Sequence, residues 1–417
     1  MVISTVWPDQ GNDASKPQPV SFYGYADAMG DAFGRMRVSN PQTLADYKQI
    51  HDNLPLYWDE SLESGAGITS AHDPNDAATT ITSTASTAGL FTRRSFQRFN
   101  YQPGKSQLTF MTGVLVASGG GTGVQTRMGL FDDNNGIFVV YDEGALKFVI
   151  RSNQTGTPVD TEVEQSSWNI DHLNGTGRSA HSLDPTKTQI LIIDFEWLGV
   201  GSVRIGFVIN GVVCYAHKFN HANTLDCVYM STPNLPLTYQ METTAAAAAS
   251  SMKTICCSVM SEGGVQDLGS TFYASTNGTH VDANAIGTIY AVIGMRLKTT
   301  HLGAVVKQVS MSMVSETNDD YEWIVLLNPT VDGTFTYSDL ANSACQVARG
   351  ALANTVTGGT ALNGGFAENA SGLTAVLENA RYLGSAIDGA RDEIVLCVRP
   401  LSANADIQGA LVWREFS

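Results

Sequence analysis

The chain has 417 residues, 40 of them glycine, and a formal net charge of −16, with only 15% of its residues charged. This length allows two or three domains, each with its own core. Non-specific binding to nucleic acid or to an anionic membrane needs clustered Lys and Arg, so the acidic balance argues against both partners. Runs of β-branched residues between frequent turn residues, with little helical periodicity, predict an all-β protein.

The six cysteines include no CxxC pair, and Cys214 and Cys397 lie inside apolar runs. Buried thiols that stay reduced in a cytoplasm are therefore expected. The start of the chain lacks the basic and apolar regions of a signal peptide, and no apolar run approaches the length of a membrane span. These patterns predict synthesis in a cytoplasm without membrane insertion.

Residues 1–62 are predicted to form an N-terminal arm and anchoring segment. Residues 1 to about 30 are rich in Pro, Gly and Asp without apolar periodicity, which is typical of an arm ordered by a neighbour. Farther on, Thr43 is placed to cap a short helix through Ile50, and Arg35 and Arg37 share a face if the chain there is extended. The segment 31–62 either docks on another subunit or forms an edge strand and connector. A dense apolar series favours docking: Phe33, Met36, Val38, Leu44, Tyr47, Leu54, Leu56, Tyr57 and Trp58.

Residues 63–235 are predicted to form a β-sandwich organised around residues 188–219, after a loop or weak edge strand over 64–90. Three runs within 188–219 alternate apolar and polar side chains with period two, as strands with one buried face do. Asn210-Gly211 is a strong signal for a two-residue hairpin between the second and third runs. In the third run, Tyr215 and Phe219 are expected to share a face. Turn signals spaced about 8–12 residues apart favour a sandwich or jelly roll.

A connector is expected over residues 236–255, which contain a five-alanine run beside serines and threonines. Residues 256–417 are then predicted to form a second β-sandwich, with a glycine-rich loop over 350–372. Its candidate strands cover residues 289–298, 305–314, 322–327, 334–337, 345–349, 380–383, 393–398 and 410–416.

Three stretches within residues 33–264 resemble structural proteins of tailed-phage particles. They are FGRMRVSNPQTLADYKQ at 33–49; FNYQPGKSQLTFMTGV at 99–114 with RMGLFDDNNGIFV at 127–139; and LPLTYQMETT with MKTICCSVMSEGG within 235–264. The family they resemble consists of tail- or fibre-type virion proteins without a shared chemistry. The hairpin VRIGFVINGVVCYAHKF also resembles a concanavalin-type lectin sandwich, a likeness of fold pattern that carries no binding residue.

The resemblance implies a non-enzymatic structural protein of the tail, fibre or baseplate that is made in the host cytoplasm and ends in the virion. It implies a homo-oligomer, with a trimer expected, and contacts to other virion proteins through the N-terminal arm. Two alternatives stay open: a capsid decoration or head-fibre protein, and an adhesin or depolymerase that contacts host-surface glycan. A cleft with close carboxylates would favour a depolymerase, whereas large apolar interfaces would favour the structural protein.

Asp194 and Glu196 flank Phe195 and are expected on one face of a strand. Glycoside hydrolases of the lectin-like class use carboxylates spaced along one strand, and two such groups can divide acid and nucleophile roles. The third carboxylate of that pattern is missing, because Trp197 and Leu198 follow. A solvated strand face is the preferred interpretation.

The run DDNNG at 132–136 offers oxygen ligands of the kind that Ca²⁺ prefers. Glu143 is the nearest acidic residue downstream, and Asp142-Glu143 is a second option. Because no acidic ligand stands at EF-hand spacing, a polar turn between two strands is preferred.

Histidines provide two further candidates. His181, Ser182 and Asp184 lie close in one loop, but a catalytic triad needs a nucleophile on a rigid elbow, and no GxSxG motif occurs. His217 and His221 have the spacing of a metal pair on a helix, but this segment is predicted as the end of a strand.

Four aromatic residues are candidates for a sugar-binding platform: Trp168, Tyr215, Trp323 and Trp413. Core or subunit-contact positions are the preferred interpretation for most of them. Glycine-rich runs sit in loops and do not open a helix as phosphate-binding motifs do. The sequence thus predicts no catalytic, cofactor-binding or metal-binding residue, and no cofactor.

Overall fold

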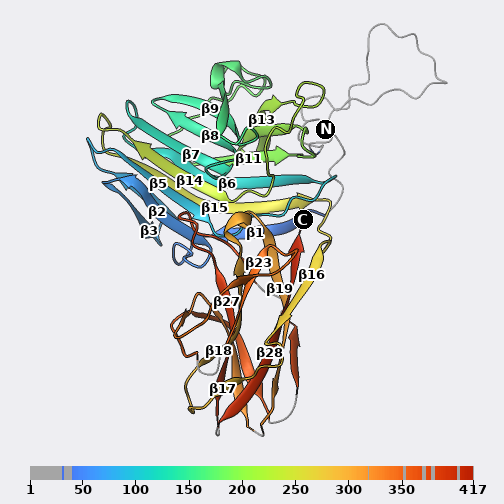
Figure 1. The fold of residues 1–417 in the computed structure, drawn as a ribbon. Helices are drawn as coiled ribbons and strands as arrows, with labels where there is room; N and C mark the ends of the chain where they lie inside the picture. Colours follow the sequence, from blue (N-terminus) through green and yellow to red (C-terminus); the bar gives the residue numbers. More distant parts are fainter. Residues whose placement is uncertain are drawn as a thin grey trace, which may run out of the picture.

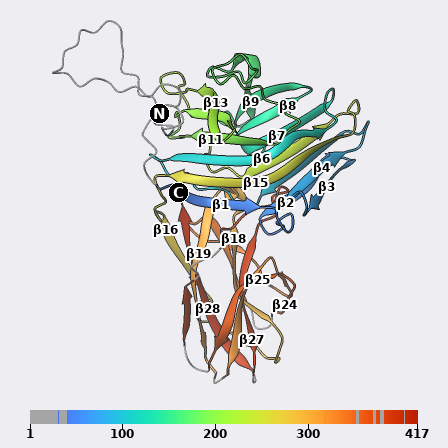
Figure 2. The same cartoon turned by 180° about the vertical axis from the view of Figure 1, so that it is seen from behind.

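The computed structural model describes residue 31 and residues 40–317, 319–350, 354–368, 372–376, 381–401 and 404–416. Among them, helical structure is confined to two single 3-10 turns, η1 (Gln165–Ser167) and η2 (Thr299–His301), so the predicted all-β class is confirmed. None of the helical segments described is long and apolar enough to cross a membrane. Two β-sandwiches follow one another along the chain, and the second extends away from one side of the first (Figures 1 and 2).

The first sandwich packs an eight-stranded sheet on a seven-stranded sheet. The eight-stranded sheet runs β13 (Val212–Phe219), β12 (Val203–Ile209), β11 (Gln189–Phe195), β6 (Ser106–Ser118), β15 (Ser250–Glu262), β4 (Ala78–Ser83) and β3 (Ile68–Asp73), with β1 (Gln42–Lys48) also paired to β15. The seven-stranded sheet runs β10 (Val159–Glu164), β9 (Ala145–Ser152), β8 (Gly136–Asp142), β7 (Val124–Phe131), β14 (Leu237–Thr243), β5 (Gly89–Ser95) and β2 (Trp58–Gly65).

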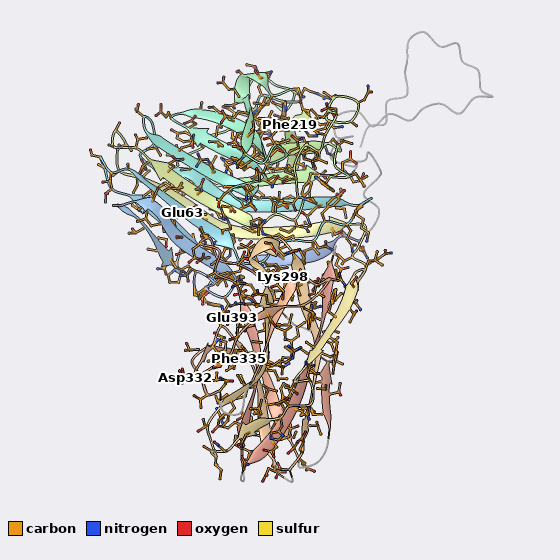
Figure 3. All side chains as sticks on the ribbon, in the orientation of Figure 1. Glu63, Phe219, Lys298, Asp332, Phe335 and Glu393 are labelled. Carbon is orange, nitrogen blue, oxygen red and sulfur yellow. The ribbon has the colours of Figure 1, made fainter. Side chains whose placement is uncertain are left out.

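The second sandwich packs a five-stranded sheet on a six-stranded sheet. The five-stranded sheet runs β16 (Ser270–Ser275), β28 (Ala405–Phe416), β19 (Val305–Ser315) and β26 (Leu373–Val376), with β17 (Val281–Ala283) also paired to β28. The six-stranded sheet runs β22 (Ser338–Asp339), β23 (Cys345–Arg349), β18 (Tyr290–Leu297), β27 (Glu393–Pro400), β20 (Tyr321–Leu327) and β25 (Thr360–Ala367). A small two-stranded sheet of β21 (Thr330–Val331) and β24 (Val356–Thr357), together with Phe335, covers its outer face (Figure 3).

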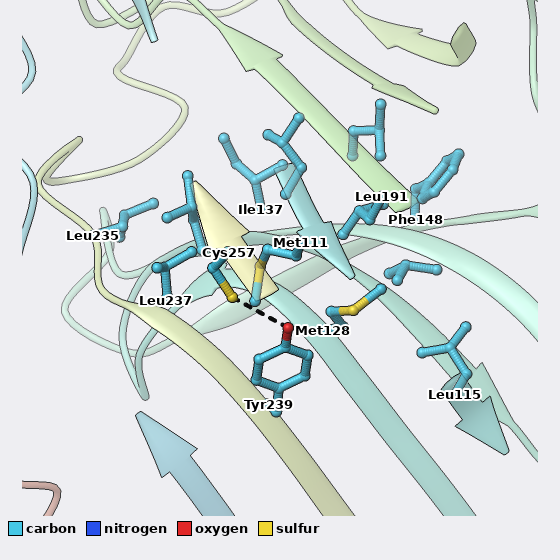
Figure 4. Close-up of a cluster of buried hydrophobic side chains, with 14 of the residues drawn as sticks. Met111, Leu115, Met128, Ile137, Phe148, Leu191, Leu235, Leu237, Tyr239 and Cys257 are labelled. Carbon is cyan, nitrogen blue, oxygen red and sulfur yellow. Dashed lines mark hydrogen bonds between the residues drawn. The ribbon is translucent and has the colours of Figure 1, made fainter. Parts of the chain in front are cut away.

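The core of the first sandwich lies between its two sheets and is built from the alternate, inward-facing residues of each strand. Phe148 of β9 stacks on Trp168 with ring centroids 4.1 Å apart. The buried hydroxyl of Tyr239 lies 3.2 Å from the thiol sulfur of Cys257 and so links β14 to β15 across the core (Figure 4). Burial raises the pKa of the Cys257 thiol to about 12, so this thiol stays protonated. None of the six cysteines, all of which are described, is in a disulfide.

The hairpin between β12 and β13 confirms the predicted turn, because Asn210 and Gly211 have φ angles of 52° and 76°, as a type I′ turn requires. The alternation in β13 differs from the prediction. Ile205 pairs with His217 and the next residue pairs with Tyr215, so Ala216 forms a β-bulge. Tyr215 therefore faces outward while Phe219 faces the core.

The predicted arm and anchoring segment differs from the structure over its described part. In place of a helix after Thr43, residues 42–48 form β1, and Tyr47 and Trp58 are buried in the first core. The period-two burial in β1 explains why a strand forms there. Residues 1–30 and the side chains of Phe33, Met36 and Val38, together with Arg35 and Arg37, lie outside the described residues.

The expected connector over residues 236–255 instead contains β14 and the start of β15, which are interior strands of the two sheets. Leu237, Tyr239 and Met241 alternate inward, and the alanine run forms only the turn between the two strands. The segment 64–90 likewise supplies β3 and β4, and the glycine-rich segment 350–372 contains β25.

Candidate functional site

The outer face of the seven-stranded sheet carries the most extensive array of polar side chains that we find in the first sandwich. Successive side chains of a strand point to opposite faces, so the polar residues between the core residues lie on this outer face. A continuous hydrogen-bonded series crosses the sheet from β2 to β10, and we call it the polar row. Its members, in order, are Glu63, Thr92, Gln240, Arg127, Gln125, Asp142, Lys147 and Glu162.

The first half of the row joins β2, β5, β14 and β7. The hydroxyl of Thr92 donates to the carboxylate of Glu63, at the β2 edge of the sheet (Figure 3). Gln240 Nε2 donates to Thr92 Oγ1 over 2.8 Å, and Arg127 Nη1 donates to Gln240 Oε1 over 2.6 Å. Each of these polar side chains is thus hydrogen-bonded to a side chain on the adjacent strand.

The second half of the row joins β7, β8, β9 and β10. Arg127 Nη2 donates to Gln125 and, over 2.9 Å, to Glu242 Oε2. Lys147 Nζ donates to Asp142 Oδ2 over 2.9 Å and to Glu162 Oε2 over 3.0 Å. The cations of the row are therefore already paired with carboxylates of the same sheet.

The charges of the row are fixed by these contacts. Burial lowers the pKa of Arg127, although Glu242 opposes this effect. Burial alone would raise the pKa of Asp142, but hydrogen bonds from Lys147 and Gln125 outweigh it and hold that pKa below its usual range. A general acid needs a carboxyl pKa near the working pH. The lowered pKa of Asp142 favours its anionic form, which suits its pairing with Lys147 better than proton donation.

The turn at 132–136 connects β7 to β8 at the end of these strands away from Gln125 and Asp142, and the Asp132 carboxylate is satisfied by nearby groups. Asp132 Oδ1 accepts the backbone N–H groups of Asn134 and Asn135, both over 2.8 Å, and Asp132 Oδ2 pairs with Arg98 over 2.6 Å. Over the part of the chain that the structure describes, no group of three His, Cys, Asp or Glu side chains could hold a metal ion. The arrangement is that of a polar turn.

Asp194 and Glu196 do not form a carboxylate pair. Asp194 is fully buried, where it pairs with Arg204 and accepts the Tyr215 hydroxyl over 2.9 Å. Glu196 lies beyond the end of β11, and its Oε1 accepts the N–H and hydroxyl of Ser202, each over 3.1 Å. The expected solvated strand face is therefore wrong for Asp194, because the guanidinium of the neighbouring strand and the outward-facing tyrosine enclose it.

The remaining candidates from the sequence do not form the sites that were considered for them. The backbone N–H of His181 donates to Ser179 Oγ over 3.2 Å, and Asp184 Oδ1 accepts the N–H and hydroxyl of Thr186, so these contacts do not connect the three residues as a triad. The ring of Phe219 lies beside both candidate metal ligands, 4.4 Å from His217 and 6.5 Å from His221 between ring centroids. The aromatic candidates are all buried: Trp168, Tyr215, Trp323 and Trp413.

His217 supports a prediction about pH. Its Nδ1 accepts the backbone N–H of Asn169 over 3.2 Å, and burial lowers its pKa to about 4. Because the ordinary pKa is about 6.5, the folded state prefers the neutral ring, and the stability that this ring contributes is complete above pH 6.5. That stability is expected to be lost as the pH falls from about 6.5 towards 4. Urea unfolding of the wild type and of His217→Gln at pH 7 and pH 5 measures it.

The His217→Gln variant is expected to lose less stability than the wild type between these two pH values, since it lacks the titrating ring. The exposed His301 provides the control, and His301→Gln should keep the wild-type dependence. An equal loss in the wild type and in His217→Gln would show that other groups cause the whole pH effect.

No protein-family model matches this sequence, and no curated protein sequence matches it. Among solved structures, it is similar to a legume lectin-like domain from Entamoeba histolytica, at 8% identity and a TM-score of 0.32, over 52% of this chain and 95% of that one. It is also similar to the CBM2 module of the evolved Dit of Lactobacillus casei BL23 phage J-1, at 7% identity and a TM-score of 0.35, over 55% and 99%. An endo-1,3-β-glucanase from Streptomyces sioyaensis matches at 10% identity and a TM-score of 0.32, over 50% and 90%.

These similarities concern a lectin-like sandwich arrangement over about half of the chain. At such identities and TM-scores they carry over no residue, ligand or activity. The polar row was missed by sequence reasoning, because its members come from positions 63 to 240 and only the tertiary fold aligns them. The single local signal is the alternation of polar and apolar residues in β7 and β14.

Proposed function

We propose that this chain is a non-enzymatic structural protein of a tailed-phage particle, in the tail, fibre or baseplate, that acts through oligomeric protein–protein interfaces. The three stretches within residues 33–264 that resemble virion proteins support this assignment. The low pKa of Asp142 and the pairing of Arg127 and Lys147 within the polar row also favour a role without turnover. The observation that carries the proposal is the junction between the two sandwiches.

The junction is built around Arg381, which precedes β27 in the second sandwich. Its guanidinium carbon lies 5.8 Å from the ring centroid of Tyr57 and 5.6 Å from that of Phe96, both in the first sandwich. Asp392 pairs with the same guanidinium over 3.3 Å. The guanidinium of Arg381, paired with Asp392 of its own domain, thus makes cation–π contacts with two aromatic rings of the first sandwich.

Backbone hydrogen bonds reinforce this junction. The N–H of Ser385 donates to the carbonyl of Phe96 over 3.3 Å, and the N–H of Ile387 donates to Asp59 Oδ2 over 2.7 Å. Domains within one chain move relative to each other unless their interface is extensive and specific. These contacts hold the two sandwiches as one elongated unit, and a particle component that must keep its shape under force needs such rigidity.

A methyl group at Gly384 is expected to loosen the junction. An added Cβ would lie 2.5 Å from the carbonyl oxygen of Phe96, closer than a real Cβ can approach, so the two domains must separate there. Hydrogen exchange of the Ser385 and Ile387 amides should accelerate at least about tenfold in Gly384→Ala, since their acceptors are on the other domain. Small-angle scattering should show a larger radius of gyration, with both sandwiches still folded.

Gly303→Ala is the matched control, because the nearest atom to its added Cβ is Arg98 Cδ at 4.0 Å. It should keep the wild-type scattering curve and exchange rates. If Gly384→Ala also keeps both, the sandwiches are not held by this junction and the proposal loses its main support.

The assignment itself is tested on the particle. Antibodies raised against the purified protein should label purified virions on the tail, and a symmetry-averaged map should contain both sandwiches at that position. Labelling on the capsid would replace the tail assignment with capsid decoration or a head fibre. Virions that contain no copy of the chain would refute a structural role.

A second candidate, a glycan-binding adhesin, is favoured by the polar row alone. Thr92 and Gln240 are buried within the row, whereas Gln125, Arg127, Asp142 and Lys147 are half-buried. One amide and several charged groups therefore reach the surface of this sheet face, where they could orient a polyol. Binding of purified host-surface polysaccharide that is lost in Arg127→Met would support this candidate. Arg296→Met, which removes a paired arginine from the second sandwich, is the control that should leave such binding unchanged.

A further inference from the structure

A cavity of about 380 Å³ lies at one margin of the first sandwich, between its two sheets. One wall belongs to the seven-stranded sheet, at the hairpin of β9 and β10. Alternation points one set of side chains of this hairpin toward the opposite sheet: Ile150, Ser152, Val159 and Thr161. The other wall begins where β13 ends, at Phe219 (Figure 3), and continues through residue 229. We call this space the marginal cavity.

The second wall of the marginal cavity is held in place by its own contacts. The N–H groups of Thr224 and Leu225 both donate to the His221 carbonyl over 3.0 Å. The Tyr229 hydroxyl donates to the Glu196 carbonyl over 2.8 Å. The ring of His221 lies nearly parallel to that of Tyr229, with centroids 4.2 Å apart. The cavity is therefore already formed without a ligand, as binding sites for small molecules usually are.

The lining of the marginal cavity has a large apolar part and no charge. None of the described residues that line it is Asp, Glu, Lys or Arg. Two of its apolar side chains lie partly in water, since Val159 is 55% exposed and Leu225 is 41% exposed. A ligand that covers them gains by burial, whereas a charged ligand would lose its water without meeting a counterion. The lining thus selects an uncharged ligand with an apolar body.

His221 supplies one hydrogen-bond acceptor to this apolar lining. Its Nδ1 lies 2.6 Å from the Gly201 carbonyl oxygen, and because a carbonyl only accepts, Nδ1 carries the proton. Burial lowers the pKa of His221, although the bond to Gly201 opposes this effect. The neutral ring therefore keeps a lone pair on Nε2. Within the part of the chain that the structure describes, we find no hydrogen bond to Nε2.

The other polar groups of the lining are less well placed to orient a ligand. Four of them belong to exposed side chains: Gln154, Thr155, Thr161 and Asn220. A sugar carries several hydroxyl groups and needs several positioned partners. Because His221 Nε2 is the acceptor fixed by its surroundings, the lining fits a ligand with one hydroxyl group better than a sugar.

We propose that the marginal cavity binds an uncharged phenol-type ring. The hydroxyl of this ring donates to His221 Nε2, and the ring itself packs against the aliphatic side chains of both walls. Such a ring is either a free phenol or the tyrosine side chain of a peptide. The inference goes beyond the structural role proposed above and does not depend on it, since the purified chain is sufficient to test it.

Titration calorimetry of the full chain with p-cresol tests the site, and a dissociation constant of about 1 mM or lower is expected. Toluene lacks the hydroxyl and should bind at least about tenfold more weakly, because it leaves Nε2 unpaired. His221→Phe keeps a flat ring and removes the acceptor, so p-cresol should then bind no better than toluene. His72→Phe is the matched control, since His72 is also half-buried with a ring nitrogen on a backbone carbonyl.

A second variant tests the apolar wall without touching His221. Val159→Asp places a carboxylate on the edge strand β10, and it should weaken the binding of both p-cresol and toluene at least about tenfold. Val376→Asp is its control, because Val376 is a 68% exposed valine on an edge strand of the second sandwich. Both positions are exposed, so circular dichroism of both variants should match that of the wild type.

N-acetyl-L-tyrosinamide separates the two sources of the ring. Tighter binding than that of p-cresol would support a tyrosine of a peptide, and weaker binding would support a free phenol. Three results would overturn the site: no binding of p-cresol to the wild type, an equal loss in His221→Phe and His72→Phe, or binding of methyl α-D-glucopyranoside at least as tight as that of p-cresol. None of these results bears on the labelling of virions, which tests the structural role separately.

Discussion

Replacing Phe148 with alanine is expected to lower the free energy of unfolding of the first sandwich by about 3–5 kcal/mol. Phe148 is fully buried, and its ring centroid lies 4.1 Å from that of Trp168 and 6.1 Å from that of Phe207. Since Phe207 is on the opposite sheet, the cavity would open where the two sheets meet, and neither sheet can move alone to fill it. Urea unfolding should show a lower midpoint with an unchanged slope.

Phe366→Ala provides the control, because it removes the same ring from an exposed position on β25. Exposed substitutions of this kind usually change stability by less than about 0.5 kcal/mol. A comparable loss in Phe148→Ala and Phe366→Ala would mean that the stacked rings do not hold the sheets together.

Glu60→Ala is expected to lower the free energy of unfolding by about 3–5 kcal/mol, because it leaves the buried charge of Arg93 without its counterion. Arg93 on β5 is completely buried, pairs with Glu60 of β2 and donates to the carbonyl of Asn53. Its guanidinium carbon lies 4.9 Å from the ring centroid of Trp58. Burial already lowers the pKa of Arg93, and Glu60 is the carboxylate that opposes this effect. Urea unfolding at neutral pH measures the loss.

The double variant Arg93→Met with Glu60→Leu separates the charge from the packing. Replacing both members of a buried ion pair with apolar residues of similar size is often close to neutral. The double variant should therefore be more stable than Glu60→Ala alone. If it is as unstable as the single variant, lost packing around Trp58 is the cause and the ion pair is not.

The strands around residues 188–219 were predictable because two local rules agree there. Period-two alternation predicts β11 and β12, and Asn210-Gly211 predicts the turn that follows β12. The bulge at Ala216 was not predictable, because the chain shows no local signal for it. In the fold, the Ala216 carbonyl accepts the N–H groups of Ile170 and Asp171 over 3.0 Å, a contact with a loop about fifty residues earlier.

The predicted connector over 236–255 was wrong, and the polar row was not predicted at all, for a related reason. An alanine run with flanking serines has the composition of a linker, and only strands from distant parts of the chain make β14 and β15 interior. The burial of Asp194 likewise depends on Arg204 and on the outward turn of Tyr215, which follows from the bulge. Pairings between distant segments cannot be predicted from the local composition of either segment.

The positions of β14 and β15 govern the order in which the first sandwich is completed during synthesis. β15 separates β6 from β4 in one sheet, and β14 separates β7 from β5 in the other, so each sheet consists of two halves until these strands exist. Both strands come last, at Leu237–Thr243 and Ser250–Glu262. A growing chain therefore carries four unjoined sheet fragments until β14 has left the ribosome. β14 can then join the halves of the seven-stranded sheet, and β15 joins those of the eight-stranded sheet only once residue 262 has emerged.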